Sequence, residues 1–122
     1  MADNRSVTLL ASAARTASVA TDDQSNSQHR GVVVIINATA ATSTPSVVAT
    51  IQGKDELSGA YYTILASAAI TGTGTTVLRV FPGATAASNL VANDVLPSTW
   101  RVNLVAADAD SLTYSVAAQL TV

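Results

Sequence analysis

The sequence predicts an all-β protein: an antiparallel two-sheet β-sandwich, immunoglobulin-like or jelly-roll-like in its layering, with seven to eight strands. Apolar and polar residues alternate over several short segments, which is the period of a strand with one buried face. Turn-forming residues separate these segments, and none of them has a clear helical period. A length of 122 residues is typical of one domain, so residues 1–122 are expected to form a single β-sandwich domain.

The first thirty residues divide into a strand-like part and a polar part. Residues 1–15 are predicted to form an N-terminal strand or arm, although their alanines would also tolerate a helix. The apolar positions on one side of this segment are Val7, Leu9, Ala11 and Ala13. Residues 16–30 are predicted to be a long polar loop, because the stretch that begins at Asp22 and Asp23 is too polar to be ordered in isolation.

The middle of the chain predicts a central strand and a hairpin. Residues 31–36 read Gly-Val-Val-Val-Ile-Ile, an unbroken run that indicates a strand covered on both faces or placed centrally in its sheet. Residues 47–54 alternate in polarity and lead through a turn at 55–59 into a second strand over 61–66. We expect these two strands to pair, with Gly59 giving the turn its backbone freedom.

The C-terminal third predicts the strongest hairpin. Residues 99–106 and 111–122 both alternate clearly, and turn-forming residues at 107–110 connect them. Trp100 and Tyr114 fall on the inward faces of these strands, so we expect both rings in the core.

A weaker strand pair is predicted just before this hairpin. Residues 63–69 are expected to pair with residues 75–81 across a turn at Gly72-Thr73-Gly74, and Pro82 ends the second strand. The following connection, 83–98, is longer than an ordinary hairpin loop and contains apolar residues, so we expect it to pack against the domain.

The composition excludes several classes of function. Only 11% of the residues are charged and the net charge is −2, with the six basic residues scattered, so direct nucleic-acid binding is not expected. The absence of cysteine excludes disulfides and thiolate chemistry. We find neither a secretory signal nor an apolar run long enough for a membrane span, which favours synthesis in the cytoplasm of the host cell and no membrane partner. The low charge indicates that partners cover part of the surface.

No residue pattern supports an enzyme, a metal or a cofactor. His29 is the only histidine, and the chain has no Gly-x-Ser-x-Gly nucleophile motif to go with it. The carboxylates occur in predicted turns, where Asp is common without any function. Asp108 and Asp110 have calcium-like spacing, but an EF-hand loop needs further ligands that are missing here. We therefore expect a non-enzymatic protein without catalytic, cofactor-binding or metal-binding residues.

Four stretches resemble small virion structural proteins of tailed bacteriophages, of the capsid decoration (cement) type. They are Gly31-Val32-Val33-Val34-Ile35-Ile36, Ile51-Gln52-Gly53-Lys54-Asp55, Ser58-Gly59-Ala60-Tyr61-Tyr62-Thr63 and Leu96-Pro97-Ser98-Thr99-Trp100-Arg101-Val102. The resemblance implies a homo-oligomeric protein present in many copies on the capsid surface of the virion. It would bind neighbouring subunits of the major capsid protein and stabilise the shell.

The interface residues expected for this function lie in the N-terminal segment, the long polar loop and a tyrosine pair. Tyr61 and Tyr62 are adjacent in a strand, so one of them should be exposed. The candidates are Arg5, Arg15, Asp22, Asp23, His29, Arg30, Tyr61 and Tyr62. Two alternatives remain open at this point: a tail-tube or head–tail joining protein, and a carbohydrate- or receptor-binding module.

Overall fold

The structure, a computed structural model, describes residues 3–122 and contains only strands and connections in this range. The strands are β1 (Arg5–Arg15), β2 (Val19–Ala20), β3 (Gln24–Ser25), β4 (Gly31–Ala41), β5 (Val47–Lys54), β6 (Tyr61–Ala66), β7 (Gly74–Val80), β8 (Val91–Ala92), β9 (Thr99–Ala106) and β10 (Leu112–Thr121). Three of them, β2, β3 and β8, have only two residues. The longer strands therefore match the predicted number, and the all-β prediction is confirmed.

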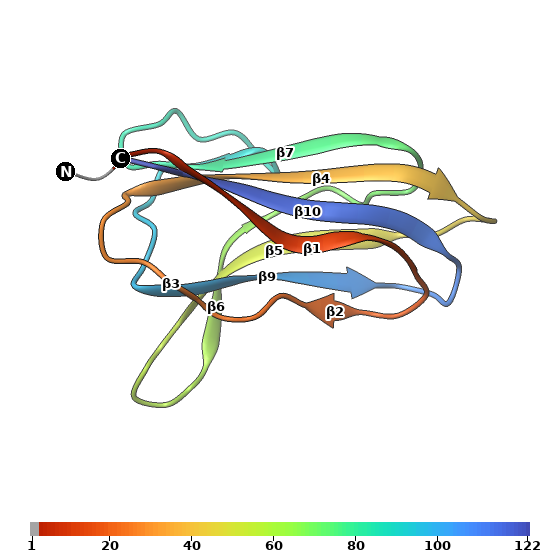
Figure 1. The fold of residues 1–122 in the computed structure, drawn as a ribbon, viewed down its shortest axis with the longest axis horizontal. Coiled ribbons are helices and arrows are strands. Elements are labelled where there is room, and N and C mark those ends of the chain that lie inside the picture. Colours follow the sequence, from red (N-terminus) through yellow and green to blue (C-terminus); the bar gives the residue numbers. More distant parts are fainter. Residues whose placement is uncertain (1–2) are drawn as a thin grey trace.

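The strands form two packed sheets (Figure 1). Sheet A has the order β1-β10-β4-β7-β8, and sheet B has the order β2-β9-β5-β6 with β3 also paired to β9. Strands β2 and β3 occupy one position beside β9, as two pieces of an interrupted strand. With that position counted once and β8 set aside, the order and the crossings between sheets are those of an eight-stranded jelly roll. The pairing is antiparallel except for the short parallel contact of β7 with β8.

The core lies between the sheets and consists of the inward residues of the long strands. Trp100 and Tyr114 are each 1% exposed, which confirms that both rings belong to the core. Around them the inward positions hold mostly valine, leucine, isoleucine and alanine, with Val34, Ile51 and Val116 completely buried. Two large rings from different sheets fill space that these smaller side chains leave open.

Strand β4 is the central strand of sheet A, as predicted from its β-branched run. It pairs with β10 on one side and with β7 on the other. The predicted β5–β6 hairpin is also confirmed, and its turn contains Gly59 at a positive φ of 77°. A residue with a Cβ would be strained in this conformation, which explains glycine at this position.

Two predicted strand pairs are wrong, for the same physical reason. Strands β9 and β10, expected to form the best hairpin, lie in opposite sheets, and so do β6 and β7. Alternation shows only that one face of a strand is buried. Two strands that face each other across the core have the same alternation as two strands that pair side by side.

The two long connections are also more structured than expected. The predicted polar loop 16–30 contains β2 and β3, and Thr21 exchanges hydrogen bonds with Val102 of β9: its N–H donates to the carbonyl at 2.9 Å and its hydroxyl accepts from the Val102 N–H at 3.0 Å. In the connection 83–98, Leu96 is buried, whereas Leu90 and Val95 are more than half exposed. The expected packing of this connection therefore holds only in part.

Arg15 holds an irregular part of sheet A together. The pairing of β1 with β10 shifts register between Leu10 and Ala13, so the strand has a bulge there. The Arg15 guanidinium donates to the carbonyl oxygens of Ala11 at 2.7 Å and Ala13 at 3.2 Å, and also to the carbonyl of Tyr114. It also lies over the Tyr114 ring, 4.6 Å from the ring centre. These contacts satisfy backbone acceptors that the bulge removes from the ladder.

Replacing Arg15 by Met should lower the free energy of unfolding by about 1 kcal/mol, because the part-buried Tyr114 carbonyl loses its donor, whereas water can replace Arg15 at the exposed Ala11 and Ala13 carbonyls. Arg5→Met provides the matched control, since Arg5 is exposed and makes no side-chain hydrogen bond with the described residues. Its effect should stay within about 0.5 kcal/mol. Urea unfolding of the two variants measures the difference, and equal midpoints would contradict this role of Arg15.

Candidate functional site

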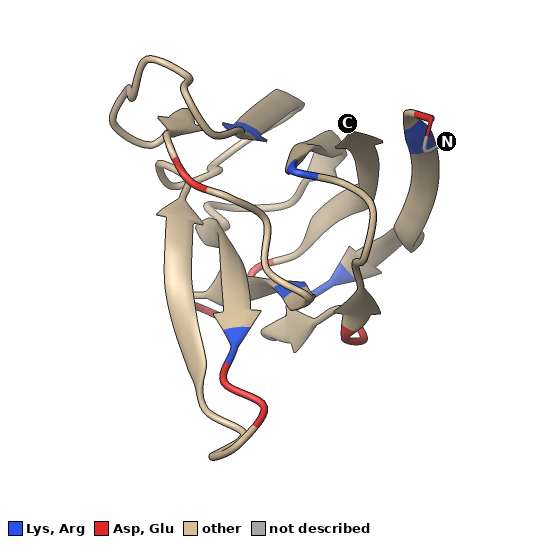
Figure 2. Cartoon of the chain, turned by 90° about the vertical axis from the view of Figure 1, so that its left-hand side faces the viewer, with Lys and Arg blue, Asp and Glu red and all other residues tan. Residues whose placement is uncertain are grey.

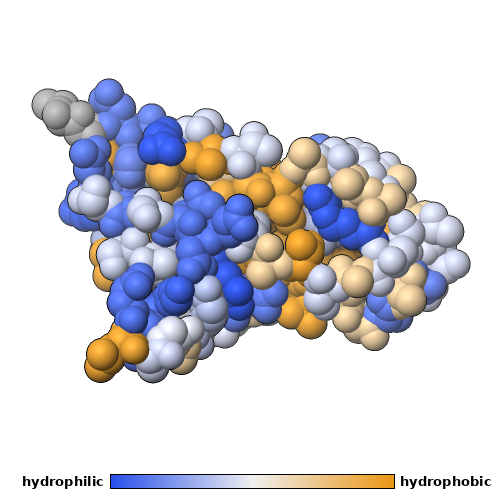
Figure 3. All heavy atoms as spheres, turned by 60° about the horizontal axis from the view of Figure 1, so that its bottom comes forward, coloured by the Kyte–Doolittle hydropathy of each residue, from blue (hydrophilic) through white to orange (hydrophobic). Residues whose placement is uncertain are grey.

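The outward face of sheet B carries a cluster of polar side chains next to the β5–β6 hairpin. Along β5 the inward residues are buried and the alternate residues, including Gln52 and Lys54, point outward. Arg101 stands beside Gln52 on β9, and Tyr61 stands beside Lys54 on β6. Asp23, from the link between β2 and β3, completes what we call the polar cluster. Figure 3 shows hydrophilic residues gathered on the half of this face nearest the projecting hairpin.

Asp23 connects the N-terminal part of the chain to this hairpin. Its carboxylate accepts a hydrogen bond from the Tyr61 hydroxyl at 2.7 Å and forms an ion pair with the Lys54 ammonium group at 2.9 Å. The Tyr61 hydrogen bond, followed by the Lys54 contact, holds the pKa of Asp23 below its usual range. In turn, Asp23 raises the pKa of Lys54 and of the Tyr61 hydroxyl.

Arg101 adds a stacking contact to the polar cluster. Its guanidinium lies 3.5 Å from the centre of the Tyr61 ring, and its Nε donates to Gln52 Oε1 at 2.8 Å. A cation in this position is attracted by the ring quadrupole. The cluster therefore uses its charges in internal contacts, and it stiffens the base of the hairpin rather than presenting a free nucleophile or base.

Beyond the polar cluster, the turn of the hairpin projects past the end of β9 (Figures 1 and 2). The pairing of β5 with β9 ends at Gly53 and Trp100. We call residues 55–60, which lie beyond this point, the hairpin tip. Asp55 orders the tip: it accepts from the Leu57 N–H at 3.1 Å and from the Ser58 hydroxyl at 2.7 Å, and the latter contact lowers its pKa. Leu57 is 96% exposed, so an ordered turn presents a leucine to solvent.

The outward face of sheet A is different, because charged residues are scarce at its centre. Three apolar residues at its centre lie side by side across β10, β4 and β7, and we call them the apolar row: Ala117, Ile35 and Val77. Thr8 on the edge strand β1 continues this row. The next row contains Ser6, Gln119, Val33 and Arg79, and Arg79 is the one charged residue in these two rows. A solvated sheet face normally carries polar residues in its centre. Valine and isoleucine at these outward positions indicate a surface suited to contact with another protein.

Of the predicted interface residues, the structure brings Asp23 and Tyr61 together in the polar cluster and places Arg5 and His29 together at a separate hollow. Tyr62 is the exposed member of the tyrosine pair, as expected, with 49% of its surface accessible. Its ring lies over Gly53, where a Cβ would overlap the tyrosine. Tyr62 therefore covers the end of the core.

Arg5 and His29 line a shallow polar hollow of about 190 Å³ near the two chain ends. The Nε2 atom of His29 is 2.8 Å from the backbone oxygen of Asp3, and Arg30 lies over the ring of Phe81 at 5.5 Å. Asp22 is exposed, and no hydrogen bond of its carboxylate is found among residues 3–122. Arg15 is occupied by the β1 bulge, so these predicted residues do not form one surface.

Lys54, Arg101 and Leu57 were not among the residues predicted from the sequence. The first two could have been found from the hairpin, because strand pairing of 47–54 with 61–66 places Lys54 next to Tyr61. Leu57 had a simpler signal, as the large apolar residue in an otherwise polar turn. Arg101 required the pairing of β5 with β9, which local patterns do not reveal.

Within residues 3–122 no group of three or more potential metal-ligating side chains comes together. The same residues contain no helix of the length and apolarity that crossing a membrane requires.

Comparison with known proteins adds little information about function. No protein-family model matches the chain, and no curated protein matches it. A solved structure of the infectious bursal disease virus Gx strain is similar over 98% of this chain, with a TM-score of 0.45 and 10% sequence identity. The present chain corresponds to 32% of that viral chain. What this protein binds must therefore be inferred from its own surface.

The Asp23 contacts should make stability depend on pH in a defined direction. Because the pKa of Asp23 is depressed in the folded state, its contribution is present above the unfolded value of about 3.9 and is lost as the pH falls through the lower folded value. Asp23→Asn should thus lower the urea midpoint at pH 7, and the difference from the wild type should shrink toward pH 2.

Asp22→Asn serves as the matched control for this measurement, since the neighbouring carboxylate lacks these contacts in the described range. It should leave the midpoint unchanged at both pH values. A difference between Asp23→Asn and the wild type that stays constant from pH 7 to pH 2 would argue against the ionised contact.

Proposed function

We propose that this chain is a non-enzymatic structural protein of a tailed-phage particle that decorates the capsid and stabilises it by binding neighbouring major capsid subunits. The single observation that carries the proposal is the outward face of sheet A. Its central strand β4 presents Val33 and Ile35 to the outside, and both are only half-buried. A partner that covers this face would remove apolar surface from water, which is the main source of adhesion between proteins.

The fold and the sequence resemblance support the same function. Jelly rolls are common in viral capsid proteins and in lectins, so the fold permits this role without selecting it. The low content of charged residues, 11%, fits a protein whose surface is shared with partners. Adhesion of many copies would stabilise the shell by mass action, because each bound copy favours the assembled state.

The lectin-like alternative has less support from the surface. Carbohydrate sites use the open face of an aromatic ring, but Arg101 covers the Tyr61 ring at 3.5 Å. Tyr62 covers Gly53 with its own ring. A tail-tube or head–tail joining role would use the same sandwich in rings and predicts few copies per particle rather than many.

Ile35→Lys tests the proposed capsid face. A charge at the centre of the apolar row should weaken binding of the purified protein to undecorated heads by at least about tenfold, because the lysine must be desolvated in the contact. Val48→Lys is the matched control. Val48 is an outward β-branched residue on β5, which pairs with β9 in the middle of sheet B. It should bind like the wild type.

Binding is measured as occupancy of heads against protein concentration, and circular dichroism checks that both variants remain folded. Equal binding of Ile35→Lys and the wild type would contradict the proposal. Deletion of residues 1–15 is a poorer test, because β1 is an edge strand of sheet A and its removal would disturb the fold itself.

A further inference from the structure

The hairpin tip is not explained by the capsid face, since it belongs to sheet B and projects away from the sandwich. Exposed leucines are ordinary, but Leu57 combines 96% exposure with a turn that is held by several hydrogen bonds. Because hydrogen bonds already fix the backbone of this turn, burial of Leu57 in a partner would have to order only its side chain. An apolar side chain on a backbone that is already ordered is suited to insertion into an apolar pocket of a partner.

The chain also carries a groove that would accept such a residue. This edge groove lies between the connection from β6 to β7 and the connection before β8, with a volume of about 380 Å³. Its apolar lining consists of Ala68, Ala69, Leu90 and Val77. Val77 is also the β7 end of the apolar row, so the groove borders the proposed capsid face at its edge. Small pockets that bind whole organic ligands begin at about 300 Å³, so the groove has room for a leucine side chain.

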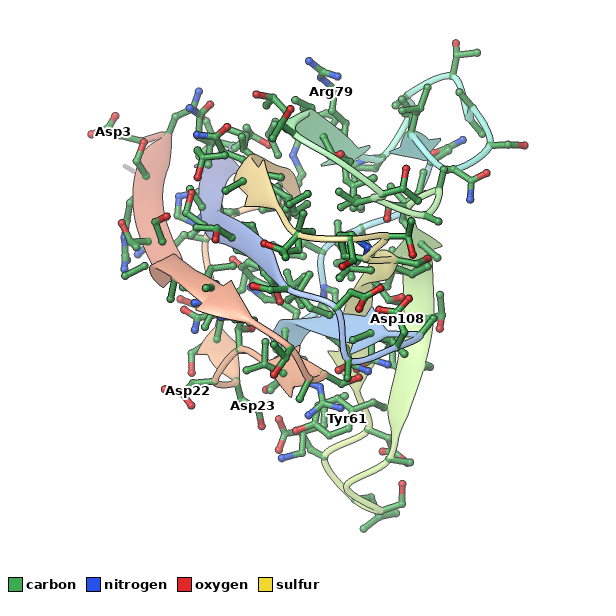
Figure 4. The ribbon with its side chains drawn as sticks, turned by 90° about the vertical axis from the view of Figure 1, so that its right-hand side faces the viewer. Asp3, Asp22, Asp23, Tyr61, Arg79 and Asp108 are labelled. Carbon is green, nitrogen blue, oxygen red and sulfur yellow. The ribbon has the colours of Figure 1, made fainter. Side chains whose placement is uncertain are left out.

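Charges near the two features have opposite signs. Asp55 and Glu56 precede Leu57 directly, and Figure 2 shows this acidic segment next to the end of the hairpin. Glu56 accepts a hydrogen bond from the Thr99 hydroxyl of its own chain, a neutral donor that leaves the negative charge of the carboxylate without a cation partner in the described residues. Arg79 points outward from β7 on the same face as Val77, two residues further along the strand (Figure 4). Arg79 is exposed, and its guanidinium makes no ion pair within residues 3–122. Complementary charges of this kind set the register of a contact.

We propose that Leu57 of one copy inserts into the edge groove of a neighbouring copy, with Glu56 of the first copy facing Arg79 of the second. This contact specifies how copies of the proposed decoration protein touch one another, and it rests on that function only for its location on the particle. The occupant is a second copy because this chain itself supplies both the apolar anchor and a groove of matching charge.

One chain cannot make this contact with itself. The tip precedes Tyr61, the first residue of β6, whereas the groove begins at Ala68, beyond the far end of this strand. Six extended residues span about 20 Å, so the two features lie well apart. Figure 4 shows Tyr61 and Arg79 toward opposite ends of the molecule. The contact is therefore head-to-tail, and repetition would produce a ring or a row of copies.

Cysteine cross-linking tests this contact on the free protein. The chain contains no cysteine, so single substitutions report one position each. A mixture of the Leu57→Cys and Ala69→Cys proteins should form a disulfide-linked dimer at least about tenfold faster than a mixture of Leu57→Cys and Val105→Cys. Val105 is 45% exposed on the outward face of sheet B and provides the matched control.

Charge exchange separates a specific contact from random collision. Adding Glu56→Arg to the Leu57→Cys protein should slow cross-linking to Ala69→Cys, and adding Arg79→Glu to the Ala69→Cys protein should restore it. Equal rates for the two cysteine pairs, or no rescue by the double exchange, would overturn the proposal. Cross-linking is measured on the free protein, without phage heads. A negative cross-linking result therefore does not bear on head binding through Ile35, and a loss of head binding does not bear on the cross-linking result.

Discussion

The structure depends on one constraint of chain connectivity: most connections carry the chain from one sheet to the other. Strands β9 and β10 are consecutive, yet they lie in opposite sheets, and each contributes one large buried ring, Trp100 and Tyr114, to the core between the sheets. Such crossings tie the sheets together through long-range contacts rather than local hairpins. The β5–β6 turn is the exception among the long strands, because it joins two neighbours in the same sheet. That turn is consequently free to extend beyond the core.

The two outward faces follow from this arrangement and have different properties. In sheet B, the interrupted strand formed by β2 and β3 brings Asp23 over the base of the hairpin, where Lys54 and Tyr61 bind it. These contacts use the charges internally and support the tip. In sheet A, the central strand keeps valine and isoleucine on its outward side. One face thus stiffens a projection, whereas the other carries apolar side chains at its centre.

The sequence predicted the fold class and the core well, but not the connectivity. Alternation identified the inward Trp100 and Tyr114, because burial on one face is a local property of a strand. It could not distinguish pairing within a sheet from packing across the core, so the expected β9–β10 hairpin was wrong. The polar segment 16–30 is ordered by backbone bonds from Thr21 and its neighbours to β9, which no local pattern indicates. For the same reason Asp23 and Tyr61 were selected separately, and their contact came from the tertiary structure.

In the particle, we expect the outward face of sheet A to be buried against the major capsid subunits. Electron cryomicroscopy of purified heads that carry this protein tests it most directly, because the map gives both the number of copies and their orientation. We expect many copies on the outside of the shell, each with Ile35 facing a major capsid subunit. Copies confined to a single ring at the tail, or copies whose sheet A face points into solvent, would contradict it.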